Sequence, residues 1–194
     1  SIEPSELKSL VTAVRRIEMA LGDGRKVPVA AEKSIANATR ASFLNAYFSP
    51  AYFIYLVRNG YAVAEGIRRK ANPARYGNPD YQSTYPISLC AEQWCATDRV
   101  LMEDRALLNR FLCVKYEELV ATPRESLRAV TDFLELDPLQ EDQLERSWRI
   151  HGVQSEIRDM NETAQERLSA EDRKEISAVA RDVLEKYGYT MPSG

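Results

Sequence analysis

The sequence has very few residues that commonly bind metals or form disulfides. Its 194 residues contain one histidine, His151, and three cysteines. A single histidine excludes any mechanism that needs two histidines and any metal site built from several of them. Cys90, Cys95 and Cys113 show no metal-ligand spacing, and the first two lie in a predicted helix as small buried residues. We therefore expect no metal and a reducing, cytoplasmic compartment.

Long apolar runs and blocks of like charge are also absent. No apolar stretch approaches 18 residues and there is no signal-peptide pattern, which predicts a soluble chain without a membrane span. The balance of 26 basic and 29 acidic residues argues against a general nucleic-acid binder. The length suits one well-buried core with an attached helical piece. Because the chain begins with Ser1, we expect it to be a fragment of a longer protein.

The most informative stretch is residues 51–70. Tyr52 to Val57 is an unbroken apolar and aromatic run, typical of a strand buried on both faces. Arg58 follows it, Asn59-Gly60 supplies turn residues, and a helical pattern then begins. The helix N-terminus should point free N–H groups near the Arg58 guanidinium, which predicts an anion site at the carboxyl edge of the sheet. The same pattern equally fits an ordinary connection whose arginine pairs with a carboxylate.

The remaining pattern is mainly helical. Residues 111–115 form a second predicted strand, and Thr122 with Pro123 and Glu125 predicts a capped helix start. Further helices are expected at 3–21, 37–47, 86–108, 139–148 and 169–187, the last ended by Gly188. Residues 25–34 read as a linker and 71–85 as a surface loop. This order indicates an α/β fold whose parallel sheet is incomplete, because two strands do not make a stable parallel sheet.

Several short motifs, taken together, resemble one family. They are Phe53 to Gly60 with Ala62-Val63, Trp94, Val114 to Leu119 with Pro123, and Phe133 to Leu136. In order and spacing they resemble the C-terminal half of sulfotransferases that use 3′-phosphoadenosine 5′-phosphosulfate (PAPS). Asp159-Met160-Asn161 and Gly188-Tyr189 are similar to bacterial members. The resemblance covers residues 32–194 and implies a P-loop-NTPase-like sulfotransferase fold.

The resemblance also implies roles for three residues. Arg58 matches the arginine that holds the nucleotide's 3′-phosphate. Gly66 stands where the family has a serine that shares this task, but glycine has no hydroxyl. Tyr116 matches a tyrosine that lies near the adenine, although a strand-end residue that merely packs its ring is a close alternative. The family's glycine-rich loop for the 5′-phosphosulfate has no counterpart in residues 1–50, so this chain alone is expected to lack donors for the transferring group.

A second resemblance covers only residues 2–32. Glu3 to Leu7, Val14-Arg15, Glu18 to Gly22 and Lys26 to Pro28 resemble the helix and linker that end the barrel of sialic-acid (nonulosonate) synthases. It carries no catalytic residue. The simplest combined account divides the chain into a synthase-like segment, 1–31, and a sulfotransferase-like domain, 32–194.

Other candidate residues have equally good structural explanations. Arg68-Arg69-Lys70 with Arg75 fits a solvated helix end better than an acceptor site. His151 has no partner motif that would make it a base. Two carboxylates, Glu32 and Glu65, are conceivable bases. Three loop tyrosines could line a sugar-binding face or simply pack the loop, namely Tyr76, Tyr81 and Tyr85.

Three functions follow as hypotheses. The first is sulfuryl transfer from PAPS to a hydroxyl of a carbohydrate or small-molecule acceptor, with no catalytic residue assigned and no metal. The second is part of a sialic-acid synthase, which forms a carbon–carbon bond with phosphoenolpyruvate. The third is a non-catalytic α/β module whose open sheet edge associates with another chain, including a second copy of itself.

Overall fold

The computed structural model describes residues 31–140, 148–150, 153–155 and 157–191. A 3-10 helix η1 (Ile35–Arg40) leads into α2 (Ala41–Tyr47), so the helix predicted at 37–47 is present with a tighter first half. The predicted helix at 3–21, and with it the synthase-like segment, lies outside the described residues. Within the described part of the chain, no helix has the length and apolar character needed to cross a membrane.

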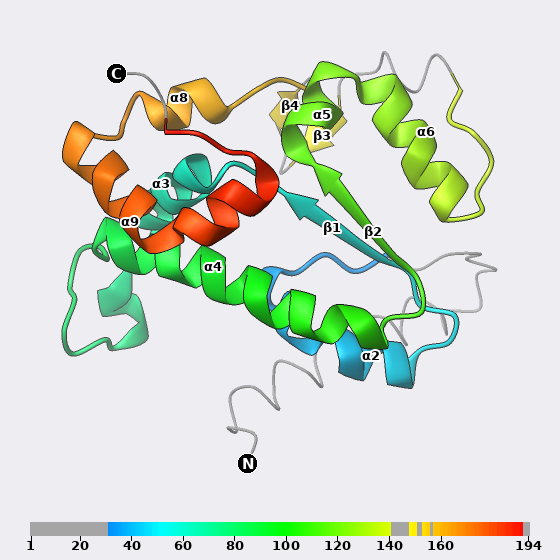
Figure 1. Cartoon of the computed structure of the whole chain (residues 1–194), viewed down its shortest axis with the longest axis horizontal. Coiled ribbons are helices and arrows are strands. Elements are labelled where there is room, and N and C mark those ends of the chain that lie inside the picture. The colour runs from blue at the N-terminus through cyan, green and yellow to red at the C-terminus, as the bar shows by residue number, and fades with distance from the viewer. Residues whose placement is uncertain (1–30, 141–147, 151–152, 156, 192–194) are drawn as a thin grey trace.

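Two parallel strands form the centre of the described structure. Strand β1 (Phe53–Val57) pairs with β2 (Phe111–Lys115), with Phe53 opposite Phe111 and Val57 opposite Lys115. Between them in sequence lie α3 (Gly60–Lys70), the 3-10 helix η2 (Pro73–Tyr76), α4 (Ile87–Asp104) and the 3-10 helix η3 (Arg105–Leu107). The strands run side by side towards the end of the molecule where α3, α5 and α8 gather (Figure 1). The predicted α/β class with an incomplete parallel sheet is therefore observed.

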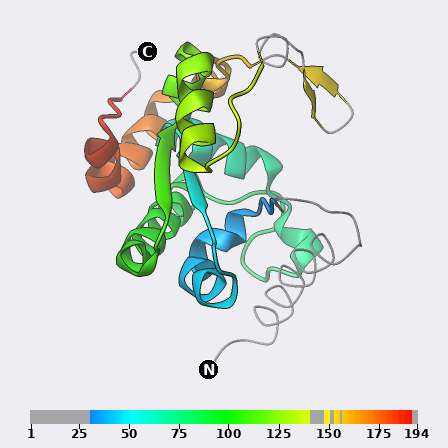
Figure 2. The same ribbon diagram turned by 90° about the vertical axis from the view of Figure 1, so that its right-hand side faces the viewer.

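Helices cover one face of the sheet. Val57 lies in a core cluster with Tyr61 of α3, Trp94 of α4 and Ile176 of α9 (Ala170–Tyr187). Phe53 and Tyr55 pack against a second cluster that contains Leu101 and Leu108. Figure 2 shows the same two strands from the side, with the helices gathered around them.

The prediction that β1 is buried on both faces is wrong. Ile54 and Leu56, which point away from the covered face, are 42% and 48% exposed. Their exposure follows from strand geometry, because successive side chains alternate between faces and the core clusters take only the alternate residues Phe53, Tyr55 and Val57.

The C-terminal half begins with two consecutive helices, α5 (Tyr116–Ala121) and α6 (Pro123–Phe133). Pro123 starts α6 as predicted, but Thr122 does not cap it with its side chain. The Thr122 hydroxyl instead donates to the Glu118 carbonyl of the preceding helix, 3.2 Å away. Because α5 ends directly at Thr122, a carbonyl of its last turn competes with the expected cap.

The predicted helix at 139–148 is wrong at both ends. Leu139 and Gln140 form no helix after Pro138, and Trp148 begins an antiparallel strand pair, β3 (Trp148–Ile150) with β4 (Val153–Ser155). Residues 141–147 lie outside the described part. Cross-strand pairing decides the conformation at Trp148, and sequence periodicity does not register an element of three residues.

The chain closes with the short helix α8 (Asn161–Gln165) and the long helix α9. The Ser169 hydroxyl accepts the Asp172 N–H and the Asp172 carboxylate accepts the Ser169 N–H, so the predicted start forms a full capping box. Gly188 ends α9 in the left-handed conformation with φ of 71°, which glycine adopts without strain. Both predicted ends of this helix are confirmed.

Candidate nucleotide site at the carboxyl edge of the sheet

The pairing of β1 with β2 brings Arg58 and Tyr116 together. Val57 and Lys115 are partners in the register, so the residues that follow them leave the sheet at neighbouring positions. The guanidinium carbon of Arg58 lies 4.5 Å from the centroid of the Tyr116 ring. Two of the three residues predicted to bind the nucleotide therefore meet at the sheet edge predicted for the site, as a cation–π pair.

The Tyr116 hydroxyl attaches this pair to the segment before α8. It donates to the carbonyl of Arg158 at 2.8 Å and accepts the backbone N–H of Met160 at 3.1 Å. The ring is held at its edge by the hydroxyl and on one face by Arg58. Both predicted alternatives for Tyr116 remain open, because a ring in this position packs at the strand end and is also placed beside Arg58.

Asn161, the first residue of α8, fixes the orientation of Arg58. Its side-chain oxygen accepts the Arg58 Nε–H at 2.7 Å, and its Nδ2 donates to Oε1 of Glu117 at 2.7 Å. Only 6% of Asn161 is exposed. Among the described residues, Nε is the Arg58 nitrogen with a hydrogen-bond partner, and the two terminal nitrogens have none there.

Glu117 is the acidic group of the site, and it corrects the prediction of a free helix N-terminus. Its Oε1 accepts the backbone N–H of Asn59 at 2.9 Å, directly before α3, while the Asn59 side chain accepts the N–H of Tyr61. The protein's own carboxylate and amide thus occupy two of the N–H groups that the sequence pattern predicts to be open, those of Asn59 and Tyr61. A negative charge at this position is favoured by the helix dipole.

Tyr189 completes the environment of Glu117. Its hydroxyl donates to Oε2 of Glu117 at 2.8 Å. Burial, together with this hydrogen bond, raises the pKa of the Tyr189 hydroxyl well above its ordinary value, so the group remains a donor throughout the physiological range. Glu117 accepts hydrogen bonds from three groups: the Asn59 N–H, the Asn161 amide and the Tyr189 hydroxyl.

Gly66 lies in α3, further along the helix that starts beside Arg58. Nothing lies within 4 Å of the position that a Cβ would occupy there, so the absence of a side chain is not required by packing. Gly60, at the start of the same helix, is the opposite case: a Cβ would lie 2.5 Å from the Trp94 ring. Its close approach to the indole requires glycine.

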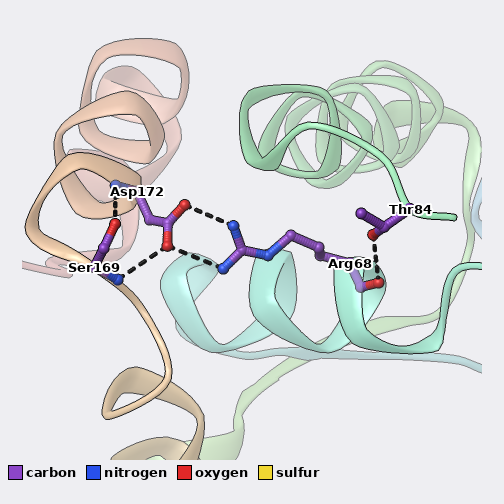
Figure 3. Close-up of polar contacts among 4 residues, drawn as sticks. All are labelled: Arg68, Thr84, Ser169 and Asp172. Carbon is purple, nitrogen blue, oxygen red and sulfur yellow. Dashed lines mark hydrogen bonds and ion pairs between the residues drawn. The ribbon is translucent and has the colours of Figure 1, made fainter. Parts of the chain in front are cut away.

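Two of the basic residues that end α3, Arg68 and Arg69, form ion pairs within the protein. Arg68 makes two hydrogen bonds to the Asp172 carboxylate, at 2.6 and 3.0 Å, and the Arg68 carbonyl accepts the Thr84 hydroxyl (Figure 3). These hydrogen bonds with Arg68 hold the pKa of Asp172 below its ordinary value. The arrangement ties α3 to α9, and the Arg68 side chain is only 27% exposed. The predicted solvated helix end is therefore wrong for Arg68, because a carboxylate of α9 takes its guanidinium.

The two carboxylates considered as bases differ in their surroundings. Glu65 is buried, and its Oε1 lies 3.3 Å from Arg69 and 3.6 Å from Arg167, which makes it the centre of an ion-pair cluster. Glu32 is half-buried ahead of η1. His151 lies outside the described residues. No group of three or more potential metal ligands occurs in the part of the chain that the structure describes.

The loop after α3 shows how its tyrosines are used. Tyr81 and Tyr85 pack edge to face with ring centroids 5.5 Å apart, and Tyr76 is 78% exposed. Packing of the loop therefore accounts for two of the three tyrosines, and Tyr76 keeps a free aromatic surface.

Sequence analysis missed Glu117, Asn161 and Tyr189 as members of the site. Glu117 follows Tyr116 within the motif from Val114 to Leu119, and Asn161 and Tyr189 belong to the two short segments that are similar to bacterial sulfotransferases. Their positions within these motifs are the signal that could have identified them. No pattern in the sequence indicated that contacts 44 to 103 residues apart join them.

Comparison with known proteins agrees with this architecture. A solved sulfotransferase domain from the curacin biosynthetic pathway aligns with a TM-score of 0.66 and 18% identity over 98% of this chain and 76% of that one. A sulfotransferase domain from the Synechococcus PCC 7002 olefin synthase aligns with a TM-score of 0.52 and 25% identity over 83% and 58%. The predicted sulfotransferase fold is confirmed.

The sequence comparisons agree with the fold. This chain is 24% identical over 123 residues to protein-tyrosine sulfotransferase A of Caenorhabditis elegans, a match that spans 62% of this chain and 31% of that protein. A family model described as the sulfotransferase family matches residues 5–141, including most of the segment that resembled a synthase, and nothing in the comparisons favours the synthase alternative. The chain therefore belongs to the sulfotransferase family.

Proposed function

We propose that this chain binds PAPS and forms the nucleotide-holding part of an enzyme that transfers its sulfuryl group to an acceptor hydroxyl. The observation that carries the proposal is the pairing of Arg58 with Tyr116 at the carboxyl edge of the sheet. This edge is where open α/β folds bind ligands, and the planar guanidinium suits two phosphate oxygens.

In the proposed complex the terminal nitrogens of Arg58 hold the 3′-phosphate. The Tyr116 ring lies next to the adenine, and Gly66 lies beside the phosphate without supplying a hydroxyl. A backbone N–H or a water molecule takes the place of that missing donor. The Glu117 carboxylate keeps its negative charge near the proposed phosphate position. Three uncharged hydrogen-bond donors stabilise that charge, so Glu117 does not need Arg58 as its partner.

The proposed reaction is an in-line transfer. The acceptor oxygen forms a bond to sulfur while the bond between sulfur and the bridging phosphate oxygen breaks, and the electron pair stays on the leaving adenosine 3′,5′-bisphosphate. The acceptor hydroxyl releases its proton to water, since no residue of this chain is assigned as the base. Donors for the transferring group are not assigned to residues of this chain, so we expect binding of the bisphosphate to be separable from turnover.

The acceptor is a hydroxyl of a carbohydrate or small molecule. The name of the C. elegans relative adds the hydroxyl of a protein tyrosine to the acceptors worth testing. Incubation with sulfur-labelled PAPS and a panel of sugars, small alcohols and tyrosine peptides, followed by detection of the labelled product, would distinguish them. If the protein binds the bisphosphate but labels no acceptor of the panel, the proposed function is limited to nucleotide binding.

Calorimetric titration with adenosine 3′,5′-bisphosphate tests the nucleotide site. We expect binding to the wild-type chain, with much weaker binding of AMP, which lacks the 3′-phosphate, and loss of this preference in Arg58→Ala. Arg110→Ala is the matched control, because Arg110 stacks on Tyr52 at 4.8 Å at the opposite end of the same two strands. Equal affinity for the bisphosphate and AMP in the wild-type chain would refute the proposal.

A further inference from the structure

We propose that Asn161 is a positioning residue that keeps Arg58 available to a phosphate, an inference that rests on the nucleotide site proposed above. Asn161 has no assigned role in binding or transfer. It comes from α8, 103 residues after Arg58 in the sequence, and reaches the guanidinium through a hydrogen bond of 2.7 Å. Because Asn161 lies between them, Arg58 does not form an ion pair with the nearby Glu117 carboxylate.

The amide of Asn161 is used on both sides. Oδ1 accepts from Nε of Arg58, and Nδ2 donates to Oε1 of Glu117, both at 2.7 Å. The backbone N–H of Asn161 donates to the Asp159 side chain at 2.7 Å, which fixes the start of α8. A neutral group that donates on one side and accepts on the other can bridge an arginine and a carboxylate, whereas a carboxylate or an ammonium group at this position cannot.

The choice of nitrogen determines what Arg58 can bind. A guanidinium grips an oxyanion either through Nε with one terminal nitrogen or through both terminal nitrogens. The hydrogen bond to Asn161 occupies Nε, and the guanidinium carbon lies over the Tyr116 ring, 4.5 Å from its centroid. The end-on pair of terminal nitrogens is left for the phosphate.

Asn161 also separates two opposite charges. Glu117 and Arg58 each contact the same amide, yet no ion pair joins them among the described residues. A direct bidentate ion pair would occupy the terminal nitrogens of Arg58 and remove the site for an anion. The backbone N–H of Asn59 and the Tyr189 hydroxyl hold Glu117 from other directions, so this carboxylate needs no arginine to satisfy it.

The substitution Asn161→Asp tests this arrangement with almost no change in shape. It replaces the bridging NH₂ with an oxygen beside Glu117 and places a negative charge on Arg58. We expect the affinity for adenosine 3′,5′-bisphosphate to fall about tenfold or more, while the affinity for AMP changes little. Asn78→Asp is the control with the same charge change, since Asn78 accepts two backbone N–H groups in the loop before α4 and a carboxylate can do the same.

A double-mutant cycle shows whether Asn161 acts through Arg58. In the Arg58→Ala background, Asn161→Ala should change bisphosphate affinity by no more than about twofold, because the group on which Asn161 acts is gone. The cycle uses Asn161→Ala because the added charge of Asn161→Asp would also repel the phosphate directly. A merely structural role would lower binding by the same factor in both backgrounds.

A measurement without ligand tests the contact itself. In the nitrogen-15 NMR spectrum, the Arg58 Nε–H signal is assigned by its loss in Arg58→Lys. Its hydrogen should exchange slowly with water in the wild-type chain and in Asn78→Asp. The exchange should become fast in Asn161→Ala. An unprotected Nε–H in the wild-type chain would overturn the positioning role.

The two proposals fail in different ways. A wild-type chain that binds the bisphosphate and AMP equally overturns the nucleotide site and the phosphate role of Asn161 with it. The role of Asn161 alone is overturned by a different result. In that case the wild-type chain distinguishes the bisphosphate from AMP, and Asn161→Asp or Asn161→Ala distinguishes the two ligands equally well.

Discussion

Arg58 and Tyr116 leave two neighbouring parallel strands at the same edge and stack with 4.5 Å between the guanidinium carbon and the ring centroid. The contact joins residues 58 positions apart in sequence, and the strand register dictates it. The Tyr116 hydroxyl extends the contact to the segment before α8. This relationship gives Tyr116 two separable contributions, one from the ring and one from the hydroxyl.

The first prediction separates these contributions. Tyr116→Phe keeps the ring under Arg58 and removes the hydroxyl, whereas Tyr116→Leu removes both. We expect Tyr116→Leu to bind adenosine 3′,5′-bisphosphate about two- to fivefold more weakly than Tyr116→Phe, because an exposed cation–π contact contributes about 0.5 to 1 kcal/mol. Calorimetric titration of both variants provides the comparison. Equal affinities would show that the ring serves only to pack the strand end.

The second prediction compares two glycines of one helix. Gly60→Ala places a Cβ 2.5 Å from the Trp94 ring and should lower the free energy of unfolding by about 1 to 3 kcal/mol. Gly66→Ala meets no atom within 4 Å and should raise it by roughly 0.5 to 1 kcal/mol, because alanine favours the helix interior. Urea unfolding measures both. A lower free energy of unfolding in Gly66→Ala would contradict the prediction, because it would mean that the added Cβ meets other atoms at this position.

The third prediction concerns the hydroxyl that Gly66 lacks. If Gly66 lies beside the 3′-phosphate, Gly66→Ser should bind the bisphosphate about threefold or more tightly than Gly66→Ala, since a new hydrogen bond contributes about 0.5 to 1.5 kcal/mol. AMP should bind both variants alike. Alanine is the matched control because it adds the same Cβ without the oxygen. Identical bisphosphate affinities would remove Gly66 from the site.

Much of the site's location could be predicted, and the reasons are local. The apolar runs at 53–57 and 111–115, each followed by a helix, indicate parallel strands, and parallel strands end at a common edge. Arg58 and Tyr116 follow those runs directly. The strand pattern places Arg58 at this edge, and the resemblance to sulfotransferases assigns Tyr116 to the same site. The register is what shows that the two residues meet.

The parts that could not be predicted depend on competition for hydrogen bonds. The sequence pattern predicts open N–H groups at Asn59, but Glu117 reaches its backbone from the next strand end, 58 residues away. The pattern also predicts that Thr122 caps α6, but its hydroxyl bonds to the Glu118 carbonyl of the helix before it. The first competitor is placed by tertiary structure and the second by the last turn of the adjoining helix.

The fourth prediction uses the ion pair between Arg68 and Asp172. The two hydrogen bonds from Arg68 hold the pKa of Asp172 below its ordinary value of 3.8. A carboxyl group with a lowered folded-state pKa stabilises the fold above its unfolded-state pKa and loses that contribution as the pH falls through the folded-state pKa. The contribution is therefore complete near neutral pH and is lost progressively as the pH falls below about 4 towards the lowered folded-state pKa.

The variant Asp172→Asn should therefore be less stable than wild type by about 1 to 2 kcal/mol at pH 7, as it loses the ion pair and weakens the capping box. The difference should shrink as the pH falls from about 5 to 3. Asp132→Asn is the control, because Asp132 and Arg128 form an exposed pair at 3.9 Å and should matter little. Chemical unfolding across this pH range tests both. A difference that is independent of pH would mean that the charge of Asp172 does not contribute.

The central claim is that Arg58 recognises the 3′-phosphate of a nucleotide, and thermal unfolding tests it most directly. Adenosine 3′,5′-bisphosphate at about a hundred times its dissociation constant should stabilise the wild-type chain by roughly 2.7 kcal/mol, with a clear rise in the unfolding midpoint. AMP at the same concentration should shift the midpoint much less, and Arg58→Ala should abolish the difference between the ligands. No shift with the bisphosphate, or an equal shift in Arg58→Ala, would contradict the claim.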